Sequence, residues 1–352
     1  MGKNKIIKVL IVDDSRSIRD SLAAMLEGDP RIHVTGTASD PYEAARRIAL
    51  EVPDVITLDL EMPRMNGLTF LKKLMDQHPV PVVIVSSFTQ ERTDLGIRAL
   101  ALGAAEIISK PGLASPEEIN AYTLRLRDTV CAAAVQNVFM QRIIWKNIET
   151  RQKVNSVMNR NPQPLVRKLI LIGASTGGTG LISNMLKALR TDLPPVLIVQ
   201  HMPGEFTGAF ARRLDAECAL TVKEAEKNEI LKNGYVYIAN GFYHLVVKKI
   251  ANDYVCDLED GALINRHRPS VDVLFHSVAA MAAKNTMAIL LTGMGADGAK
   301  GMLELKQGGA TCIAQDEKSC VIYGMPREAV LMDAVNLTGS PEKIIGWMNN
   351  FV

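Results

Sequence analysis

Five short apolar runs, each followed by a helical pattern, fill the first third of the chain. The first of them, Ile6–Val12, is a continuous apolar run rich in β-branched residues, which is typical of a strand buried on both faces. The runs are Ile6–Val12, Ile32–Ala38, Val55–Leu58, Val82–Val85 and Ala105–Ile108. Helical patterns follow at Arg16–Leu26, Tyr42–Leu50, Leu68–Met75, Arg92–Leu102 and from Ser115, where a capping box with Pro116 begins the last one. Strict alternation of this kind predicts a doubly wound, five-stranded parallel α/β sheet.

Polar residues gather where these predicted strands end. Asp13 and Asp14 follow the first strand, Asp59 the third, Ser86 the fourth and Lys110 the fifth. Carboxyl ends of parallel strands share one edge, and function gathers there. Three carboxylates at one edge repel one another unless a cation lies among them, and oxygen ligands suit Mg²⁺. A lysine and a hydroxyl nearby can bind an anion. The set therefore predicts a site that places a phosphoryl group on a carboxylate.

With these residues in place, about residues 5–128 resemble the receiver domains of two-component systems. The resemblance implies that Asp59 accepts a phosphoryl group from a histidine kinase. It also implies that Asp13, Asp14 and Asp59 bind Mg²⁺, with help from the carbonyl of Glu61.

The same resemblance assigns the switch residues. It makes Ser86 the switch hydroxyl and Lys110 the lysine of the site, and the bond to Pro111 is often cis in such domains. One position departs from the family, because Ile107 stands where an aromatic switch residue is common.

A basic segment separates the two larger parts of the chain. Residues 141–168 carry seven Lys or Arg and one acidic residue, whereas the whole chain has a net charge of only +2. We predict a receiver over 1–128, a partly helical basic linker over 129–166 and a second domain over 167–352. A solvated linker is the favoured interpretation of the charge, and docking to an acidic partner is the alternative. A DNA-binding output is disfavoured, because the second domain is large and slightly acidic rather than short and basic.

The second domain opens with a strand, a glycine turn and a helix. The strand pattern Leu169–Gly173 leads into Ala174-Ser175-Thr176-Gly177-Gly178 and a helical segment, Leu181–Leu189. Such a turn can bind phosphate at a helix N-terminus, as in a dinucleotide-binding fold. It can equally hold a serine nucleophile in a G-x-S-x-G elbow. The motif alone does not choose between an NAD-dependent oxidoreductase and a hydrolase.

Neighbouring strand ends favour the hydrolase. The next strand ends in Gln200-His201, where a dinucleotide site would need an acid, and no tyrosine has a lysine four residues on. The run Met287–Leu291 leads to Asp297. Ser175, His201 and Asp297 would supply nucleophile, base and orienting acid. His267 remains a competing candidate for the base.

From about Leu169 to Leu337 the chain closely resembles the catalytic domain of the chemotaxis protein-glutamate methylesterases, whose layout is also receiver, linker and esterase. The stretches that carry the resemblance include GASTGGT (173–179), VQHMPGEFT (199–207), NRHRPSVDVLF (265–275), LLTGMGADGAKGM (290–302) and AQDEKSCVIYGMPREAV (314–330). It implies a doubly wound, mostly parallel α/β domain with an added antiparallel hairpin.

The resemblance also implies a reaction. Ser175 would attack glutamate methyl esters on chemoreceptors, His201 would act as the base, and Asp297 would orient it. Backbone amides near Thr176 and Met294 would form the oxyanion hole. Products would be methanol and glutamate, with no cofactor in this step, and receptor glutamines could be deamidated by the same chemistry.

Further expectations concern regulation and location. We hypothesise that the unphosphorylated receiver blocks the esterase cleft and that phosphorylation of Asp59 relieves the block. No apolar run reaches the roughly 18–20 residues that a membrane span needs, so no membrane insertion is expected. The N-terminus lacks a signal-peptide pattern, and five scattered cysteines suit a reducing cytoplasm.

Overall fold

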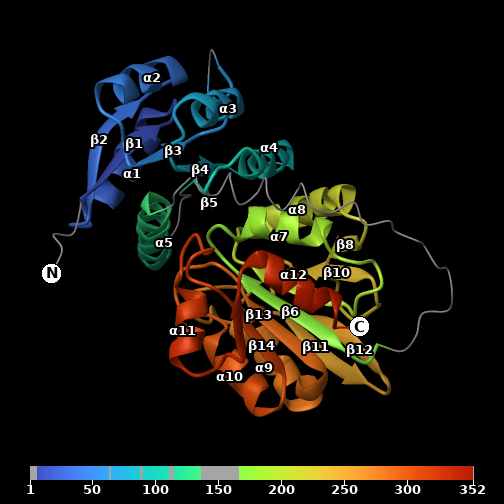
Figure 1. Ribbon diagram of the computed structural model, residues 1–352. Coiled ribbons are helices and arrows are strands. Elements are labelled where there is room, and N and C mark those ends of the chain that lie inside the picture. The colour runs from blue at the N-terminus through green and yellow to red at the C-terminus, as the bar shows by residue number, and fades with distance from the viewer. Residues whose placement is uncertain (1–5, 63–64, 88–89, 111–114, 136–165, 352) are drawn as a thin grey trace. The chain divides into compact units, whose positions relative to one another are not determined.

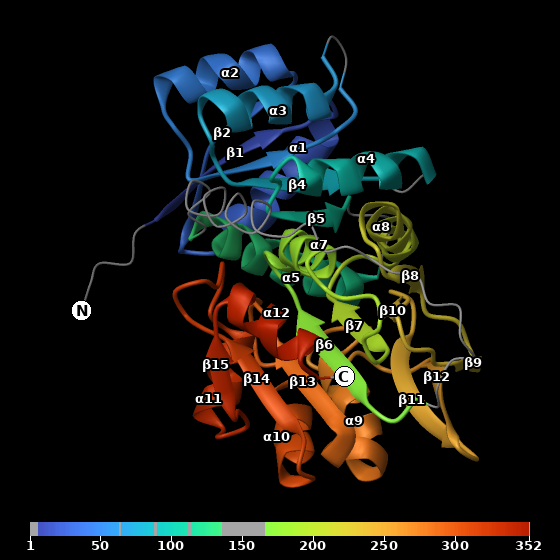
Figure 2. The same cartoon turned by 45° about the vertical axis from the view of Figure 1, so that its right-hand side comes forward.

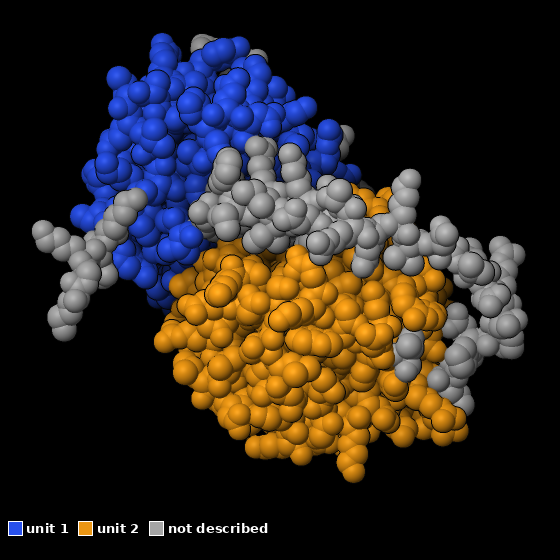
Figure 3. Space-filling model, in the orientation of Figure 1, with its two compact units in different colours: residues 1–140 blue, residues 141–352 orange. Residues whose placement is uncertain are grey.

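The computed structural model describes residues 6–62, 65–87, 90–110, 115–135 and 166–351 (Figure 1). The chain forms two compact units, residues 1–140 and 141–352, which Figure 3 colours separately. Of the predicted linker, residues 136–165 lie outside the described residues, as does Pro111, so the predicted linker helix beyond Val135 and the Lys110–Pro111 bond are not described.

The N-terminal unit is built on a five-stranded parallel sheet of order β2-β1-β3-β4-β5. The strands are β1 Ile7–Val12, β2 Ile32–Ala38, β3 Val55–Leu58, β4 Val82–Ser86 and β5 Glu106–Ser109. The helices are α1 Arg16–Glu27, α2 Pro41–Leu50, α3 Gly67–Gln77, α4 Gln90–Ala101 and α5 Pro116–Ala134. The predicted doubly wound sheet is confirmed, and each predicted strand and helix is found within a few residues of its expected bounds.

Helices cover both faces of this sheet, which explains why every residue of its inner strands β3 and β4 is buried. Apolar residues of α1 and α5 pack with Val9 and Ile11 of β1 on one face. Figure 2 shows α2, α3 and α4 on the other face. The capping box at the start of α5 is present, with the Ser115 hydroxyl accepting from the Glu118 N–H at 3.3 Å and the Glu118 carboxylate accepting from the Ser115 N–H at 2.8 Å.

The C-terminal unit holds a seven-stranded sheet of order β15-β14-β13-β6-β7-β10-β8, in which every pair is parallel. Its strands are β6 Leu169–Ala174, β7 Val196–Gln200, β8 Thr221–Glu224, β10 Tyr235–Ile238, β13 Thr286–Leu290, β14 Thr311–Gln315 and β15 Leu337–Gly339. After β6 the chain adds strands towards one edge of the sheet, beginning with β7, and after β13 it adds β14 and β15 towards the other edge. Between β6 and β13 lies the switch point where α/β sheets bind ligands.

Helices sandwich this second sheet as well. They are α7 Gly178–Lys187, α8 Gly204–Glu217, α9 Val271–Ala282, α10 Ala299–Gln307, α11 Met325–Leu331 and α12 Pro341–Asn349, with a 3₁₀ turn at Ala283–Asn285. Helix α7 contacts α8 and α12, whereas α10 contacts α9 and α11, so the two groups cover opposite faces.

A separate three-stranded antiparallel sheet completes the C-terminal unit. Its strands are β9 Glu229–Ile230, β11 His244–Ile250 and β12 Asp253–Glu259, in the order β11-β12-β9. Strand β11 packs against α9 (Figure 2). The predicted antiparallel hairpin is therefore confirmed, and β9 adds a third strand to it. Within the described ranges, no helix is long and apolar enough to cross a membrane.

Candidate active site and phosphoacceptor site

Three carboxylates meet at the carboxyl edge of the N-terminal sheet. Val12 pairs with Leu58, which places Asp13 beside Asp59 in the loops that follow. One oxygen from each of Asp13, Asp14 and Asp59 lies within 4.8 Å of the others. Asp13 and Asp59 are buried, whereas Asp14 is exposed.

Lys110 closes the opposite side of this cluster. Its Nζ lies 2.7 Å from Asp13 Oδ2 and 2.7 Å from Asp59 Oδ2. Burial raises the pKa of Asp59, Lys110 opposes the rise and Asp13 adds to it. The neighbouring Glu61 is exposed, and its N–H lies 3.4 Å from Asp59 Oδ1. Three carboxylates whose oxygens lie this close together offer the oxygen ligands that Mg²⁺ prefers.

The two predicted switch positions lie at the ends of β4 and β5. Ser86 is buried, and its hydroxyl donates to the Ser87 carbonyl at 3.3 Å. The Lys110 N–H donates to the Ser86 carbonyl at 2.8 Å, which ties the lysine to that strand end. Ile107 is buried within β5.

Ser175, His201 and Asp297 lie at neighbouring strand ends of the C-terminal sheet. Ala174 of β6 pairs with Gln200 of β7, so the residues that follow them, Ser175 and His201, are adjacent. The Ser175 N–H donates to the Thr292 carbonyl after β13 at 3.0 Å, which joins the third strand end to the first. All three residues of the predicted triad are buried, with 8%, 5% and 1% exposure, respectively.

The imidazole of His201 has one occupied and one open nitrogen. Its Nε2 lies 2.8 Å from Asp297 Oδ2. Its Nδ1 is buried and has no hydrogen-bond partner. Because a carboxylate only accepts, it holds the proton on Nε2 and leaves the lone pair on Nδ1. Nδ1 is thus the nitrogen available to a serine proton.

Asp297 is held by a dense set of donors. Its Oδ1 accepts from Ser270 Oγ at 2.7 Å and from Asn265 Nδ2 at 2.8 Å. Its Oδ2 also accepts the Val271 N–H at 2.7 Å, at the N-terminus of α9. Burial alone would raise the pKa of Asp297, but His201, Ser270 and Asn265 together hold it well below its usual range. The carboxylate therefore stays charged and fixed.

The turn after Ser175 is built for close backbone approach. Gly177 has a φ of +81°, in the left-handed region that favours glycine. A Cβ on Gly293 would lie 2.7 Å from the Ser175 Cβ, so that glycine lets the two loops meet. Gln200 Nε2 donates to the Ser175 carbonyl at 3.0 Å. Within the described residues, the N–H groups of Thr176 and Met294 donate no hydrogen bond. Both amides can therefore donate to a ligand.

Sequence reasoning missed several residues that build this site. Asn265 and Ser270 were not assigned to the acid, and Gln200 was not assigned to the serine turn. His267, the competing candidate for the base, stacks on His201 instead, with ring centroids 3.6 Å apart. By contrast, His244 is a satisfied core residue, because both of its ring nitrogens are within hydrogen-bonding distance of a partner.

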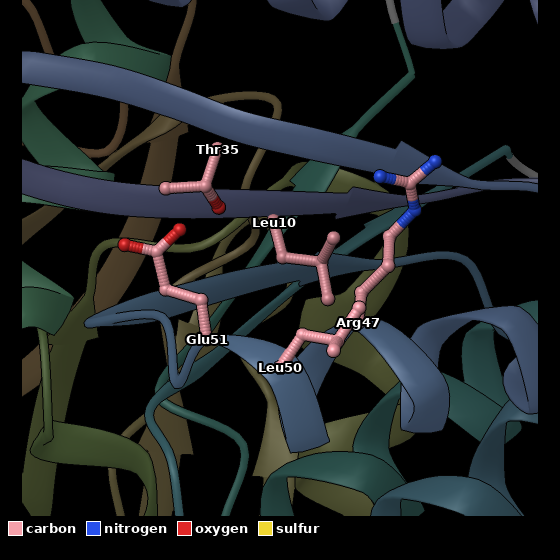
Figure 4. A pocket seen from close by; sticks show the side chains of 5 residues that line it. All are labelled: Leu10, Thr35, Arg47, Leu50 and Glu51. Atoms are coloured by element: carbon pink, nitrogen blue, oxygen red, sulfur yellow. The ribbon is translucent and has the colours of Figure 1, made fainter.

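A small groove on the N-terminal unit has no comparable chemistry. It lies beside β1, β2 and α2 and is lined by Leu10, Thr35, Arg47, Leu50 and Glu51 (Figure 4). Its arginine pairs with Glu43 at 3.0 Å and its glutamate with Lys8 at 2.7 Å. Both charged groups are already neutralised by neighbours.

Comparisons with known proteins identify the families of both units. The family model for the CheB methylesterase matches residues 170–348, and the response regulator receiver domain matches residues 9–122. A protein-glutamate methylesterase/protein-glutamine glutaminase of Bradyrhizobium diazoefficiens is 45% identical over 97% of this chain and 96% of its own. One from Geobacter metallireducens is 46% identical over 93% of each chain.

A solved structure gives the same result for the C-terminal unit. The Thermotoga maritima CheB methylesterase catalytic domain is 39% identical, covers 53% of this chain and 98% of that one, and superposes with a TM-score of 0.51. The oxidoreductase alternative has no support from these matches. Gln200 and His201, which replace the expected ribose-binding acid, instead belong to the serine site.

Proposed function

Because the chain belongs to the CheB methylesterase family, we propose that its C-terminal unit hydrolyses glutamate methyl esters on chemoreceptors, with Ser175 as the nucleophile. The products are glutamate and methanol. The observation that carries this proposal is the buried His201, paired through Nε2 with Asp297 and open at Nδ1, beside Ser175 at the same sheet edge.

The first half of the reaction forms an acyl-enzyme. His201 Nδ1 takes the Ser175 proton as Oγ attacks the ester carbonyl carbon. The N–H groups of Thr176 and Met294 stabilise the oxyanion that results. Asp297 stabilises the imidazolium and keeps its ring oriented. The intermediate then expels the methoxy group, which takes the proton from His201 and leaves as methanol.

The second half restores the enzyme. His201 removes a proton from water, the hydroxide attacks the glutamyl ester of Ser175, and the proton passes to Ser175 Oγ as the bond breaks. A glutamine side chain would follow the same steps with ammonia as the leaving group. The names of the similar proteins, which include protein-glutamine glutaminase, support deamidation as a second reaction of this site.

The N-terminal unit acts as the control element in this proposal. Asp59 accepts a phosphoryl group from a histidine kinase. Asp13, Asp14, Asp59 and the carbonyl of Glu61 would hold Mg²⁺, which would offset the negative charge of the carboxylates and the phosphoryl group. Lys110, which ion-pairs with Asp59, neutralises the added charge, and the Ser86 hydroxyl responds to it. The three clustered carboxylates support this assignment. Phosphorylation relieves inhibition of the esterase.

We assign the protein a receiver over 1–128, a basic linker over 129–166 and a catalytic domain over 167–352. It works in the cytoplasm, which five free cysteines support, and needs neither nucleic acid nor membrane insertion.

The test uses chemoreceptor-containing membranes carrying methyl-labelled glutamates. Wild-type protein releases labelled methanol, and Ser175→Ala releases none while its thermal unfolding stays within a few degrees of wild type. Methanol release by a folded Ser175→Ala protein would rule out Ser175 as the nucleophile.

A further inference from the structure

The ring of His267 lies flat against the ring of His201. The two centroids are 3.6 Å apart and the ring planes differ by 8°. We propose that His267 is a positioning residue for the reaction, which holds the His201 ring in line with Ser175 and stabilises its charged form. This inference rests on the role of His201 as the base, proposed above.

The His201 ring needs a second constraint. Its hydrogen bond to Asp297, 2.8 Å from Nε2 to Oδ2, fixes the position of Nε2. The ring plane can still tilt about that atom. The reacting Nδ1 is on the far side of the pivot and has no partner of its own. A flat neighbour against the ring face blocks this rotation. Because a misplacement of about 1 Å can cost roughly 10²-fold in rate, such a constraint bears directly on catalysis.

Backbone geometry holds His267 in place. The N–H of His267 donates to the Ile264 carbonyl at 2.9 Å, and the Ile264 N–H donates back to the His267 carbonyl at 3.1 Å. Between them, Asn265 and Arg266 have φ values of +51° and +68°, which are unusual for residues with a Cβ. The backbone thus forms a tight, closed loop over residues 264–267.

Asn265 anchors the same loop to the catalytic acid. Its Nδ2 lies 2.8 Å from Asp297 Oδ1 and 2.7 Å from Asp272 Oδ2. One loop therefore contacts the acid through Asn265 and the base through His267. A loop that served only as a surface connection would need neither contact.

The geometry of the stack favours the charged base. Neutral aromatic rings prefer offset arrangements with centroids about 4.5–7 Å apart over a face-to-face sandwich. The stack, with centroids 3.6 Å apart, therefore contributes little stabilisation while both rings are neutral. With His267 neutral, the cation that forms when His201 takes the serine proton faces the His267 π-cloud, an attractive arrangement. Because the imidazolium forms during the reaction, the contact stabilises the transition state more than the bound substrate.

Steady-state kinetics of methanol release separate this role from a structural one. His267→Ala removes the ring, His267→Leu keeps the bulk without a flat π-face, and His267→Phe keeps an aromatic face. We expect kcat to fall about 10- to 100-fold in the Ala and Leu variants, with KM changed less than about threefold. The Phe variant should recover kcat to within about fivefold of wild type.

A matched control is His276→Ala, because His276 is an exposed histidine on α9 that pairs with Glu304. It should keep wild-type kcat and KM. Ring NMR of histidine-labelled protein adds a second readout. The Nε2–H signal of His201 should persist in the Phe variant and broaden in the Ala and Leu variants.

The outcomes are distinct. Wild-type kcat and an unbroadened His201 signal in the Ala or Leu variant would overturn the role of His267. A Phe variant as slow as the Leu variant would also overturn it, because the aromatic face would then be irrelevant. Activity in Ser175→Ala, run alongside, would instead contradict the proposed nucleophile. If the Ala variant does not fold, the Leu and Phe variants still decide between these results.

Discussion

In the candidate active site, a single carboxylate, that of Asp297, orients the imidazole of His201. Asp297 accepts from the His201 ring, from two side chains and from the N-terminal backbone of α9. Because fixed donors already stabilise this carboxylate, its surroundings need not reorganise when the neighbouring imidazole becomes cationic. Its role is therefore to fix which His201 nitrogen carries the resting proton.

Replacing this carboxylate tests that role. Asp297→Asn keeps the shape of the acid but offers an amide N–H to Nε2, which favours the wrong tautomer. We expect kcat for methanol release to fall roughly 10³- to 10⁴-fold. The exposed Asp333→Asn serves as the control and should leave kcat unchanged. An Asp297→Asn protein within tenfold of wild type would contradict the tautomer argument.

A glycine tests how closely the loops meet at Ser175. In Gly293→Ala the new Cβ would lie 2.7 Å from the Ser175 Cβ and 2.4 Å from the Met325 Sδ. We expect lower kcat and a free energy of unfolding lower by about 1–3 kcal/mol, measured by denaturant titration.

Gly346→Ala in α12 is the matched control, because its Cβ would meet nothing within 4 Å. Alanine is the better helix former, so this variant should be neutral or up to about 1 kcal/mol more stable. If both variants had the same kcat and the same free energy of unfolding, the two loops at Ser175 would be able to move apart to accept the new Cβ.

The strand-end positions of Ser175 and His201 could be predicted from sequence because each directly follows a buried strand, and that of Asp297 because it lies in the loop after β13. Their supporting residues could not. Asn265 and Ser270 come from the loop before α9, and only tertiary structure brings that loop to Asp297. His267 was visible as a polar histidine, but sequence offers no sign that its ring faces His201.

At the level of elements, the predictable strands are those buried on both faces. Strands β6, β7 and β13 are buried at every position and lie at the centre of the seven-stranded sheet. The edge strands β8, Thr221–Glu224, and β15, Leu337–Gly339, are partly exposed and carry no apolar run. Since the sequence pattern indicates a strand only where its residues are buried, these two edge strands escape prediction.

Helices α7 and α8 are joined by a charged cluster around Glu217. Its carboxylate accepts from Arg213 Nε at 2.7 Å, pairs with Lys187 Nζ at 2.9 Å and accepts from the Ser183 hydroxyl at 3.1 Å. Burial raises the pKa of Glu217, but the bonds from Arg213 and Lys187 outweigh burial and hold it at about 2.

This lowered pKa predicts an acid-sensitive contribution to stability. The unfolded chain binds a proton near pH 4.5, whereas the folded protein binds it only near pH 2. The contribution is therefore complete above about pH 4.5 and is lost as pH falls towards 2. Denaturant titrations should show a shallower loss of stability in Glu217→Gln over this window. Glu342→Gln, at an exposed position of α12, should follow wild type; identical slopes for all three proteins would refute the assignment.

At the scale of the whole molecule, the chain pairs a receiver domain with a methylesterase domain. The order of the two could be predicted from sequence, because each domain displays its functional residues at strand ends. The coupling between them could not, because residue patterns within one domain do not report contacts with another.

The phosphoacceptor site should depend on a divalent cation. With Mg²⁺ and an acyl-phosphate donor, intact-protein mass spectrometry should find one phosphoryl group per chain. Chelation of Mg²⁺ should prevent this, since Asp13, Asp14 and Asp59 would otherwise repel the incoming phosphate. Equal labelling with and without the chelator would argue against a metal at these carboxylates.

The most direct test of the whole account is the rate of methanol release by the full chain from methylated chemoreceptor membranes, measured with and without an acyl-phosphate donor. We predict that the donor raises the rate of the wild-type protein, that Asp59→Asn keeps only the unstimulated rate, and that Ser175→Ala releases no methanol in either condition. An unchanged rate in a wild-type protein shown by mass to be phosphorylated would contradict the coupling of the two units.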